Sequence, residues 1–256
     1  MSAPPLLVER RDAVLVLTLN RPEQRNAVDV PMAEAIAAAL DELDGDPGLR
    51  VGVLTGAGKG FCSGMDLKAF AQTGTRPWAG DRGFAGIVRR PPRTPLVAAI
   101  EGFAVAGGLE VALACDLVVA AKGAKLGIPE AKRGLVAAGG ALRRLPRLLP
   151  APIAMELALT GELITAERAH ALGAVNRLAE PGEALTEALA LAQTIAANGP
   201  LALTASKQVL QEQWSWSDSE FFDRQAAIAD PVMASEDARE GARAFTEKRA
   251  PVWQGR

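Results

Sequence analysis

The chain has 256 residues, 49% of them hydrophobic, which is enough for one large domain or for a main domain with an appendage. Its 28 basic and 30 acidic residues leave a net charge of −2, which argues against a nucleic-acid-binding protein. There is one histidine, His170, and the two cysteines, Cys62 and Cys115, have no metal-ligand spacing. Histidine-based hydrolases and zinc sites are therefore disfavoured, and we expect no metal. Carboxylates, lysines, backbone amides and water remain as catalytic groups.

The N-terminal segment M-S-A-P-P-L-L-V-E-R has no basic stretch followed by an apolar run, and no apolar run in the chain reaches about 18 residues. We therefore expect neither a signal peptide nor a membrane span. Two unrelated cysteines are typical of a cytoplasmic protein with reduced thiols. Local basic pairs such as Arg143-Arg144 are interpreted as solvated faces.

In chain order, the hydrophobic patterns predict a mixed α/β first part followed by a helical tail. Strands are expected at 6–10, 13–19, 51–54, 95–100, 117–120 and 174–178. Helices are expected at 31–43, 109–115, 153–160, 165–172, 183–197, 200–213, 217–228 and 235–248, and another is expected to begin after the glycines at 139–140. The irregular stretch 69–95 is predicted to be a mobile, partly helical segment over a pocket. A boundary near 197–200 divides the chain into a core, 1–197, and a helical region, 198–256.

The loop from Thr55 to Lys68 is rich in glycine but matches neither nucleotide-binding motif. Gly58-Lys59 is followed by Gly60 where a Walker motif has serine or threonine, and Phe61 stands where the dinucleotide fingerprint has its third glycine. What remains is a loop whose amides, from residue 63 to 66, can approach a ligand closely because Gly64 permits unusual dihedral angles.

A second glycine loop lies in the central stretch between Glu101 and Glu130. An apolar run ending at Ile100 leads through Gly107-Gly108 into an apolar helix, so bare N–H groups are expected at the start of that helix. Glu110 falls in its first turn, and Glu130 follows twenty residues later. Amides that favour negative charge, followed by two carboxylates, indicate chemistry on a carbonyl compound.

Five internal motifs, in this order, resemble the crotonase superfamily, which is typified by enoyl-CoA hydratase. They are N-R-P-E-Q-R-N-A from Asn20, G-K-G-F-C-S-G-M-D-L from Gly58, E-G-F-A-V-A-G-G-L-E from Glu101, C-D-L from Cys115 and G-I-P-E-A-K-R-G-L from Gly127. The stretch from Ser235 to Trp253 is similar to the C-terminal signature of the family, so the resemblance covers nearly the whole chain. It implies an α/β fold: a spiral of ββα units in two roughly perpendicular sheets, with a C-terminal helical region that builds homotrimers, often paired into hexamers.

The resemblance also implies roles for individual residues. The amides of Met65 and Gly107 match the two donors that stabilise a thioester enolate, and Glu110 and Glu130 match the two catalytic glutamates. Residues matching those that bind coenzyme A are Arg25, Ala27, Lys59, Ser63, Asp66 and Leu67, together with Phe245 and Lys248, which would reach the coenzyme A of a neighbouring subunit. Ala106, where many members have a third glycine, and Met65, where alanine is common, put the shape of the pocket in question but remove no amide.

The resemblance therefore predicts a hydro-lyase that adds water reversibly to a 2-enoyl-CoA thioester. Coenzyme A is part of the substrate, so no separate cofactor is expected, and the partners are an acyl-CoA and further copies of the chain. The stretches from Pro129 and Gly139 especially resemble the branch acting on crotonobetainyl- or carnitinyl-CoA. The same motifs would also suit an enoyl-CoA isomerase or a non-catalytic acyl-CoA-binding protein. The sequence does not indicate which acyl group the substrate carries.

Overall fold

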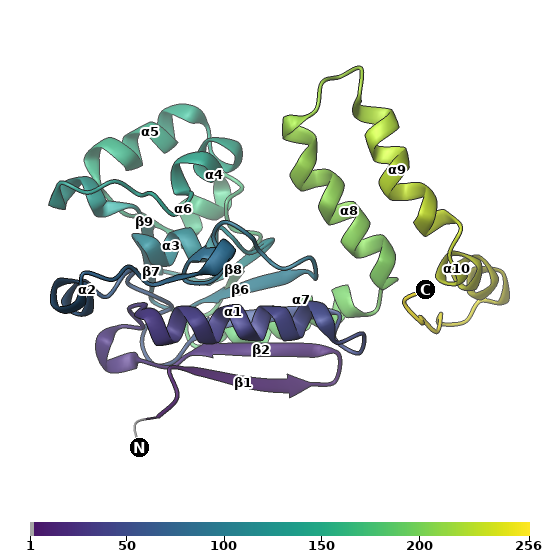
Figure 1. Cartoon of the computed structure of the whole chain (residues 1–256), viewed down its shortest axis with the longest axis horizontal. Coiled ribbons are helices and arrows are strands. Elements are labelled where there is room, and N and C mark those ends of the chain that lie inside the picture. The colour runs from purple at the N-terminus through teal and green to yellow at the C-terminus, as the bar shows by residue number, and fades with distance from the viewer. Residues whose placement is uncertain (1–2) are drawn as a thin grey trace.

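The computed structural model describes residues 3–256 and contains a six-stranded sheet at its centre (Figure 1). In spatial order the strands are β1 (Leu6–Arg11), β2 (Val14–Leu19), β3 (Val51–Gly56), β6 (Leu96–Ile100), β8 (Leu117–Ala121) and β11 (Arg177–Ala179). Only β1 and β2 pair in antiparallel fashion, and the other neighbours are parallel. Parallel strands need crossover connections, which explains why helices alternate with strands through this part of the chain.

Helices cover both faces of this sheet. Alternate residues of β2 belong to different cores: Leu15 and Leu17 pack with α1 (Val30–Gly45), and Val14 and Val16 pack with α7 (Ala184–Ala196). Because successive side chains of a strand point to opposite faces, a nearly continuous apolar strand is the expected sequence for this double-sided packing.

A second, three-stranded sheet lies beside the first, in the order β10 (Ile164–Thr165), β9 (Lys125–Gly127) and β7 (Phe103–Val105). Strand β7 runs parallel to β9, and β10 runs antiparallel to it. The hydrophobic pattern predicted none of these strands, because each has only two or three residues and β9 contains a lysine and a glycine. The pairing between distant segments, rather than local propensity, makes them strands.

The predicted irregular stretch is partly helical, as expected, and it also contains a small hairpin. Helix α2 (Leu67–Thr73) is followed by β4 (Trp78–Ala79), a short 3₁₀ turn and β5 (Gly83–Phe84).

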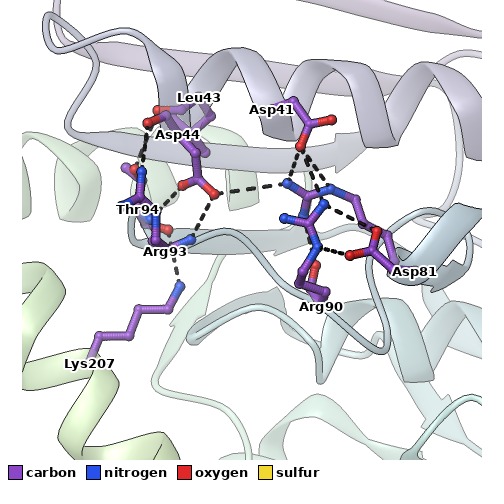
Figure 2. Close-up of polar contacts among 9 residues, drawn as sticks. Asp41, Leu43, Asp44, Asp81, Arg90, Arg93, Thr94 and Lys207 are labelled. Carbon is purple, nitrogen blue, oxygen red and sulfur yellow. Dashed lines mark hydrogen bonds and ion pairs between the residues drawn. The ribbon is translucent and has the colours of Figure 1, made fainter.

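Charged side chains fix this stretch to its surroundings, as the network in Figure 2 shows. The buried Arg82 guanidinium donates to the Asp41 carboxylate of α1 at 2.5 and 3.1 Å and to the carbonyl of Arg90 at 2.7 Å. The Asp44 carboxylate accepts from the N–H of Thr94 at 2.9 Å. The segment is therefore anchored at its middle and at its C-terminal end.

The connections between the long strands carry four more helices. Figure 1 shows α3 near the centre and α4, α5 and α6 grouped together. Their bounds are α3 (Gly107–Ala112), α4 (Ala141–Leu148), α5 (Ala151–Thr160) and α6 (Ala166–Ala171).

Two predicted elements are displaced. The strand expected at 174–178 lies at Arg177–Ala179, because Asn176 bonds to Val118 through its own N–H and through its side chain before the ladder begins. The helix expected at 217–228 is α9 (Phe221–Met233), because the Glu220 carboxylate accepts from the hydroxyl and N–H of Ser217 and closes a turn there.

The C-terminal helices project away from the body of the molecule (Figure 1). They are α8 (Pro200–Glu212), α9 and α10 (Glu236–Glu247), and the break between α7 and α8 falls where the boundary was predicted. The division into a core and a helical region stays a prediction. No single helix in residues 3–256 is long and apolar enough to cross a membrane. One helix pair, Ala184–Ala196 with Pro200–Ser215, would be long and apolar enough if its two helices were taken together, but they are bent by 108° relative to each other.

Candidate active site

Three roughly parallel segments end side by side and bring the predicted site residues together. Strands β7 and β9 pair through Val105 and Gly127, and Cys62 forms an isolated parallel bridge with Ala104 of β7. The segment after Cys62 leads to Met65, the chain after β7 leads to α3, and the chain after β9 leads to a 3₁₀ turn, Pro129–Arg133, that carries Glu130. The unpredicted small sheet is therefore what assembles the site.

The two amides predicted as oxyanion donors lie on loops that touch. A Cβ built on Gly64 would lie 2.9 Å from the nitrogen of Gly107, and one built on Gly107 would lie 3.3 Å from the Cα of Gly64. Within residues 3–256, the N–H of Met65 and the N–H of Gly107 have no hydrogen-bond acceptor. Unpaired amides are costly unless water or a ligand bonds to them, so they are available to an incoming oxygen.

Ala106 has a backbone conformation that is unusual for an alanine. Its φ of 53° and ψ of −132° lie outside the left-handed helical region and in a region that glycine favours. Its N–H donates to the carbonyl of Gly127 at 2.9 Å, and its carbonyl accepts from the N–H of Glu110 at 3.2 Å. This strained residue therefore connects the strand that precedes Glu130 with the helix that holds Glu110.

Glu110 is buried at the start of α3, and its surroundings favour its neutral form. Burial raises the pKa of the carboxyl to about 7, the N–H of Ala141 opposes this by donating to Oε1 at 3.1 Å, and the charge of Glu130 raises it further. A Cβ on Gly139 would overlap the carboxylate, so only glycine leaves room for it. Near pH 7 this carboxyl can both take up and release a proton.

Glu130 is half-buried, and its Oε2 atom is buried without a hydrogen-bond partner in residues 3–256. Burial raises its pKa above the ordinary value, and the nearby charge of Arg133 opposes this. A buried carboxylate oxygen with no protein donor is costly unless it is protonated or bonded to something else. Burial therefore raises the pKa of both glutamates.

The residues predicted to bind coenzyme A fall into two groups. One group gathers around the loop of Met65: the carbonyl of Arg25 accepts from the N–H of Ser63 at 3.1 Å, and Ala27 precedes Val28, which forms a bridge with Met65. Asp66 caps α2 by accepting from the N–H groups of residues 68 and 69.

The remaining predicted residues are exposed. Lys59 and Leu67 lie at the rim of the same loop. Phe245 and Lys248 lie at the end of α10, which projects away from the body in Figure 1, so they are not brought to the site by their own chain. The assignment of all eight to coenzyme A stays a prediction.

Sequence reasoning missed polar residues that support the site. The Arg21 guanidinium donates to the carbonyl of Ala27 at 2.5 Å and to the Asp66 carboxylate at 2.9 Å, joining the two loops of the first group. The buried Asn26 side chain donates to the carbonyls of Ala57 and Gly60. The polar loop N-R-P-E-Q-R-N-A signals that such residues are present, but it does not reveal which side chains point inward.

The interpretation of Arg143-Arg144 as a solvated pair is wrong for its second member. Arg143 is exposed, but Arg144 is half-buried and donates to the carbonyl of Val88 at 2.7 Å. The positions of the two arginines on α4 explain the difference, because adjacent residues of a helix point about 100° apart.

Comparison with known proteins agrees with this geometry. The family model described as enoyl-CoA hydratase/isomerase matches residues 9–256. The chain belongs to the enoyl-CoA hydratase/isomerase family. It has the crotonase fold of that family, as its structural neighbours do.

Within this family, similar proteins span the whole chain. The enoyl-CoA hydratase EchA19 of Mycobacterium tuberculosis is 43% identical over 261 residues, which cover 100% of this chain and 98% of that protein. Carnitinyl-CoA dehydratase of Salmonella typhi is 40% identical and covers 98% of both chains. The crystal structure of enoyl-CoA hydratase EchA1 from Mycobacterium marinum has a TM-score of 0.97 at 56% identity, with 99% of this chain and 100% of that chain covered.

Proposed function

We propose that this protein is a hydro-lyase that adds water reversibly to the double bond of a 2-enoyl-CoA thioester. One observation carries the proposal: two amides that have no acceptor within residues 3–256 lie near two carboxyl groups with raised pKa values, on a chain of the enoyl-CoA hydratase/isomerase family. A folding role alone gives no reason to keep both pairs together.

The amides of Met65 and Gly107 would bind the thioester oxygen. Addition of water to the β-carbon moves electrons onto that oxygen, and a fixed N–H that points at it stabilises the resulting enolate. Each donor of this kind contributes about 3 kcal/mol to the transition state in other oxyanion sites. The strained backbone at Ala106 supports this assignment, because it turns the chain from β7 into α3 directly before the amide of Gly107.

The two glutamates would move the protons. Glu110, with its pKa near 7, would hold the water and take its proton as the oxygen bonds to the β-carbon. Glu130, whose Oε2 has no donor in the described part of the chain, would deliver a proton to the α-carbon. One proton leaves water and one proton reaches carbon, so the atoms balance without a metal or a redox cofactor. Since the carboxyl groups interact, they titrate as a pair.

The first group of coenzyme A residues, near Met65, would bind the thioester end of the substrate within one chain. Phe245 and Lys248, exposed at the far end of α10, would contact the coenzyme A of a neighbouring copy, so we propose a homotrimer or a hexamer of two trimers. We also propose a cytoplasmic location, which the two free buried cysteines support.

Carnitinyl-CoA dehydration is the second candidate. The 40% identity with a carnitinyl-CoA dehydratase over 98% of both chains favours it, and it needs the same four groups acting on a cationic acyl chain. A parallel assay with crotonobetainyl-CoA separates the two candidates by kcat/KM.

The test follows the absorbance of the conjugated enoyl thioester with crotonyl-CoA and a longer enoyl-CoA. We expect the native protein to remove the absorbance and Glu110→Gln or Glu130→Gln to lower kcat by about 10²- to 10⁴-fold at unchanged substrate affinity. Glu156→Gln, at an exposed glutamate of α5 that belongs to neither pair, is the matched control and should keep full activity. Demonstrable binding with no turnover of any enoyl-CoA would make the protein an acyl-CoA-binding protein instead, and a shifted double bond would make it an isomerase.

A further inference from the structure

The Arg144 guanidinium is bound by main-chain carbonyls from two separate parts of the chain. It donates through Nη2 to Val88 at 2.7 Å and through Nη1 to Gly139 at 3.4 Å. A Cβ on Gly140 would overlap Nη1, and Gly140 has a φ of +107°, so the guanidinium lies directly on the Gly139–Gly140 turn. Within residues 3–256, both hydrogen bonds of the Arg144 guanidinium therefore go to neutral carbonyls, and no carboxylate forms an ion pair with it.

The other side of the same turn holds the Glu110 carboxylate. The N–H of Ala141 donates to Oε1 at 3.1 Å, and the absence of a side chain at Gly139 leaves the space that the carboxylate occupies. A turn of two glycines thus separates a buried cation from a buried carboxylate. Because glycine is flexible, this turn needs an external contact to keep its amides aimed at Glu110.

Val88 belongs to the stretch that packs against the oxyanion loops. Its N–H bonds to the carbonyl of Phe84 at 3.3 Å, and the Phe84 ring would lie 2.7 Å from a Cβ on Gly107. Arg144 therefore joins the turn beside the candidate base with the segment that contacts one candidate oxyanion donor.

The charged and titratable groups around this arginine come from three elements. Arg143 and Arg147 are on α4 itself, with Arg143 exposed and the Arg147 guanidinium stacked 5.0 Å from the ring of Trp214. Glu110 lies on α3, and Cys115 follows that helix. Glu130, on the 3₁₀ turn after β9, is the second carboxylate, and its charge acts on Glu110. Within this cluster, Arg144 is the half-buried cation whose charge acts on Glu110.

We propose that Arg144 is a positioning residue for this reaction: it fixes the Gly139–Ala141 turn that orients Glu110, and its positive charge favours the carboxylate form of Glu110 that acts as the base. The role rests on the proposed hydratase function. The direction of the electrostatic effect is consistent with it, because the charge of Arg144 lowers the pKa of Glu110 while burial raises it. Burial lowers the pKa of Arg144 itself, but an arginine stays charged at neutral pH.

The experiment compares three variants by steady-state hydration over a range of pH. Arg144→Met removes both the charge and the two hydrogen bonds, Arg144→Lys keeps the charge but not the planar fork, and Arg143→Met is the matched control on the exposed side of the helix. Circular dichroism and thermal melting verify that each variant is folded. In parallel, the ¹³C signal of the Glu110 carboxyl, assigned with Glu110→Gln, is titrated by NMR in each variant.

We expect Arg144→Met to lower kcat by about 10- to 100-fold with KM nearly unchanged, because a displaced base reduces the fraction of productive complexes. The acidic limb of its kcat/KM profile should move to higher pH, and so should the titration of Glu110. Arg144→Lys should return the limb toward its native position while kcat stays reduced. Arg143→Met should match the native protein in all of these measurements.

An unchanged acidic limb and an unchanged Glu110 titration in folded Arg144→Met would overturn the proposal, as would equal effects from Arg143→Met. If Arg144→Met does not fold, the same judgement is made on Arg144→Lys, whose kcat must fall for the proposal to stand. Failure of the hydratase function is recognised separately, because the native protein would then turn over no enoyl-CoA. The titration of Glu110 still decides the electrostatic part in that case.

Discussion

The core and the C-terminal helical region bury their hydrophobic side chains to very different extents. Helix α1 buries six residues, including Met32, Ile36 and Leu40, between its sheet and the neighbouring segments. In contrast, α8 and α9 bury none, and α10 buries only Asp237 and Ala244. The helical region leaves large side chains exposed in the single chain: Trp214 is 62% exposed, Phe222 74%, Met233 75% and Phe245 86%.

This difference indicates separate tasks for the two parts. The core buries most of its large apolar side chains within one chain and contains both amides and both glutamates of the candidate site. The helical region buries almost none of its own, so we expect another surface to cover it. We therefore expect the core to carry the chemistry and the helical region to carry assembly.

The largest expected effect is on the mass of the particle. We predict that light scattering gives three or six times the chain mass of 26.7 kDa for the native protein, and that Phe222→Asp shifts the population toward the single chain. A carboxylate in an apolar interface carries an uncompensated desolvation cost. The control is Met155→Asp, at an exposed methionine of α5 in the core, which should leave the mass unchanged. A native protein that is monomeric at working concentrations would contradict the assignment of assembly to the helical region.

The next effect concerns the joint between the two parts. Lys207 of α8 donates to the Asp116 carboxylate at 2.5 Å and to the carbonyl of Thr94 at 3.0 Å, the second of which is drawn in Figure 2. Asp116 also accepts from the N–H of Leu96 in the central sheet at 2.8 Å, and burial raises its pKa. The pair is largely buried, with 9% of the lysine side chain and 20% of the aspartate side chain exposed.

Lys207→Met should therefore lower the free energy of unfolding by about 3–5 kcal/mol, because it leaves a buried carboxylate without its cation. Urea unfolding at a fixed protein concentration measures the change. The double variant with Asp116→Asn should recover part of the loss, since the orphaned charge is then removed. A loss below about 1 kcal/mol in the single variant would mean that the two parts are held together by other contacts.

The third prediction concerns whether the buried Glu110 carboxylate destabilises the folded core. The folded protein retains the Glu110 proton up to about pH 7, whereas the carboxyl has an ordinary pKa of 4.5. Between these values the folded state binds more protons than the unfolded state, so its stability falls as the pH rises. At pH 8 the free energy of unfolding of Glu110→Gln should be higher than that of the native protein by on the order of 2–3 kcal/mol. This difference should disappear below pH 4.5.

Urea unfolding at several pH values measures this difference, with Glu156→Gln as a matched substitution of an exposed glutamate. That control should follow the native pH dependence. Parallel curves for native protein and Glu110→Gln would show that burial does not favour the neutral carboxyl.

The long elements of both parts could be predicted from the sequence, because α1 has apolar residues at helical spacing and the central strands of the large sheet are nearly continuous apolar runs. The candidate amides and glutamates could be named through the family resemblance. What brings them together could not be predicted: β7 and β9 are three residues each, and a pattern so short does not distinguish a strand from a loop.

The arginines that support the site could not be predicted from the sequence for a different reason. Arg21 and Arg144 have the sequence surroundings of surface residues, and only the tertiary structure shows that carbonyls accept from both guanidinium groups and that the Asp66 carboxylate accepts from Arg21. A buried arginine differs from an exposed one by its partners, which lie far away in sequence. Composition around the residue does not encode them.

The smallest effect concerns the strained alanine of the core. Ala106→Gly should raise the free energy of unfolding by about 1 kcal/mol, because relief of an unfavourable φ and ψ outweighs the added freedom of glycine in the unfolded chain. Thermal and urea unfolding measure the gain.

Ala190→Gly, in the exposed middle of α7, is the control and should lower stability by about 1 kcal/mol, since glycine is unfavourable in a regular helix. Opposite signs for the same chemical change would show that the core stores strain at the junction between the two candidate oxyanion loops. Losses of equal size would mean that the alanine is unstrained there, and the methyl group at position 106 would then be a packing contact against Gly64.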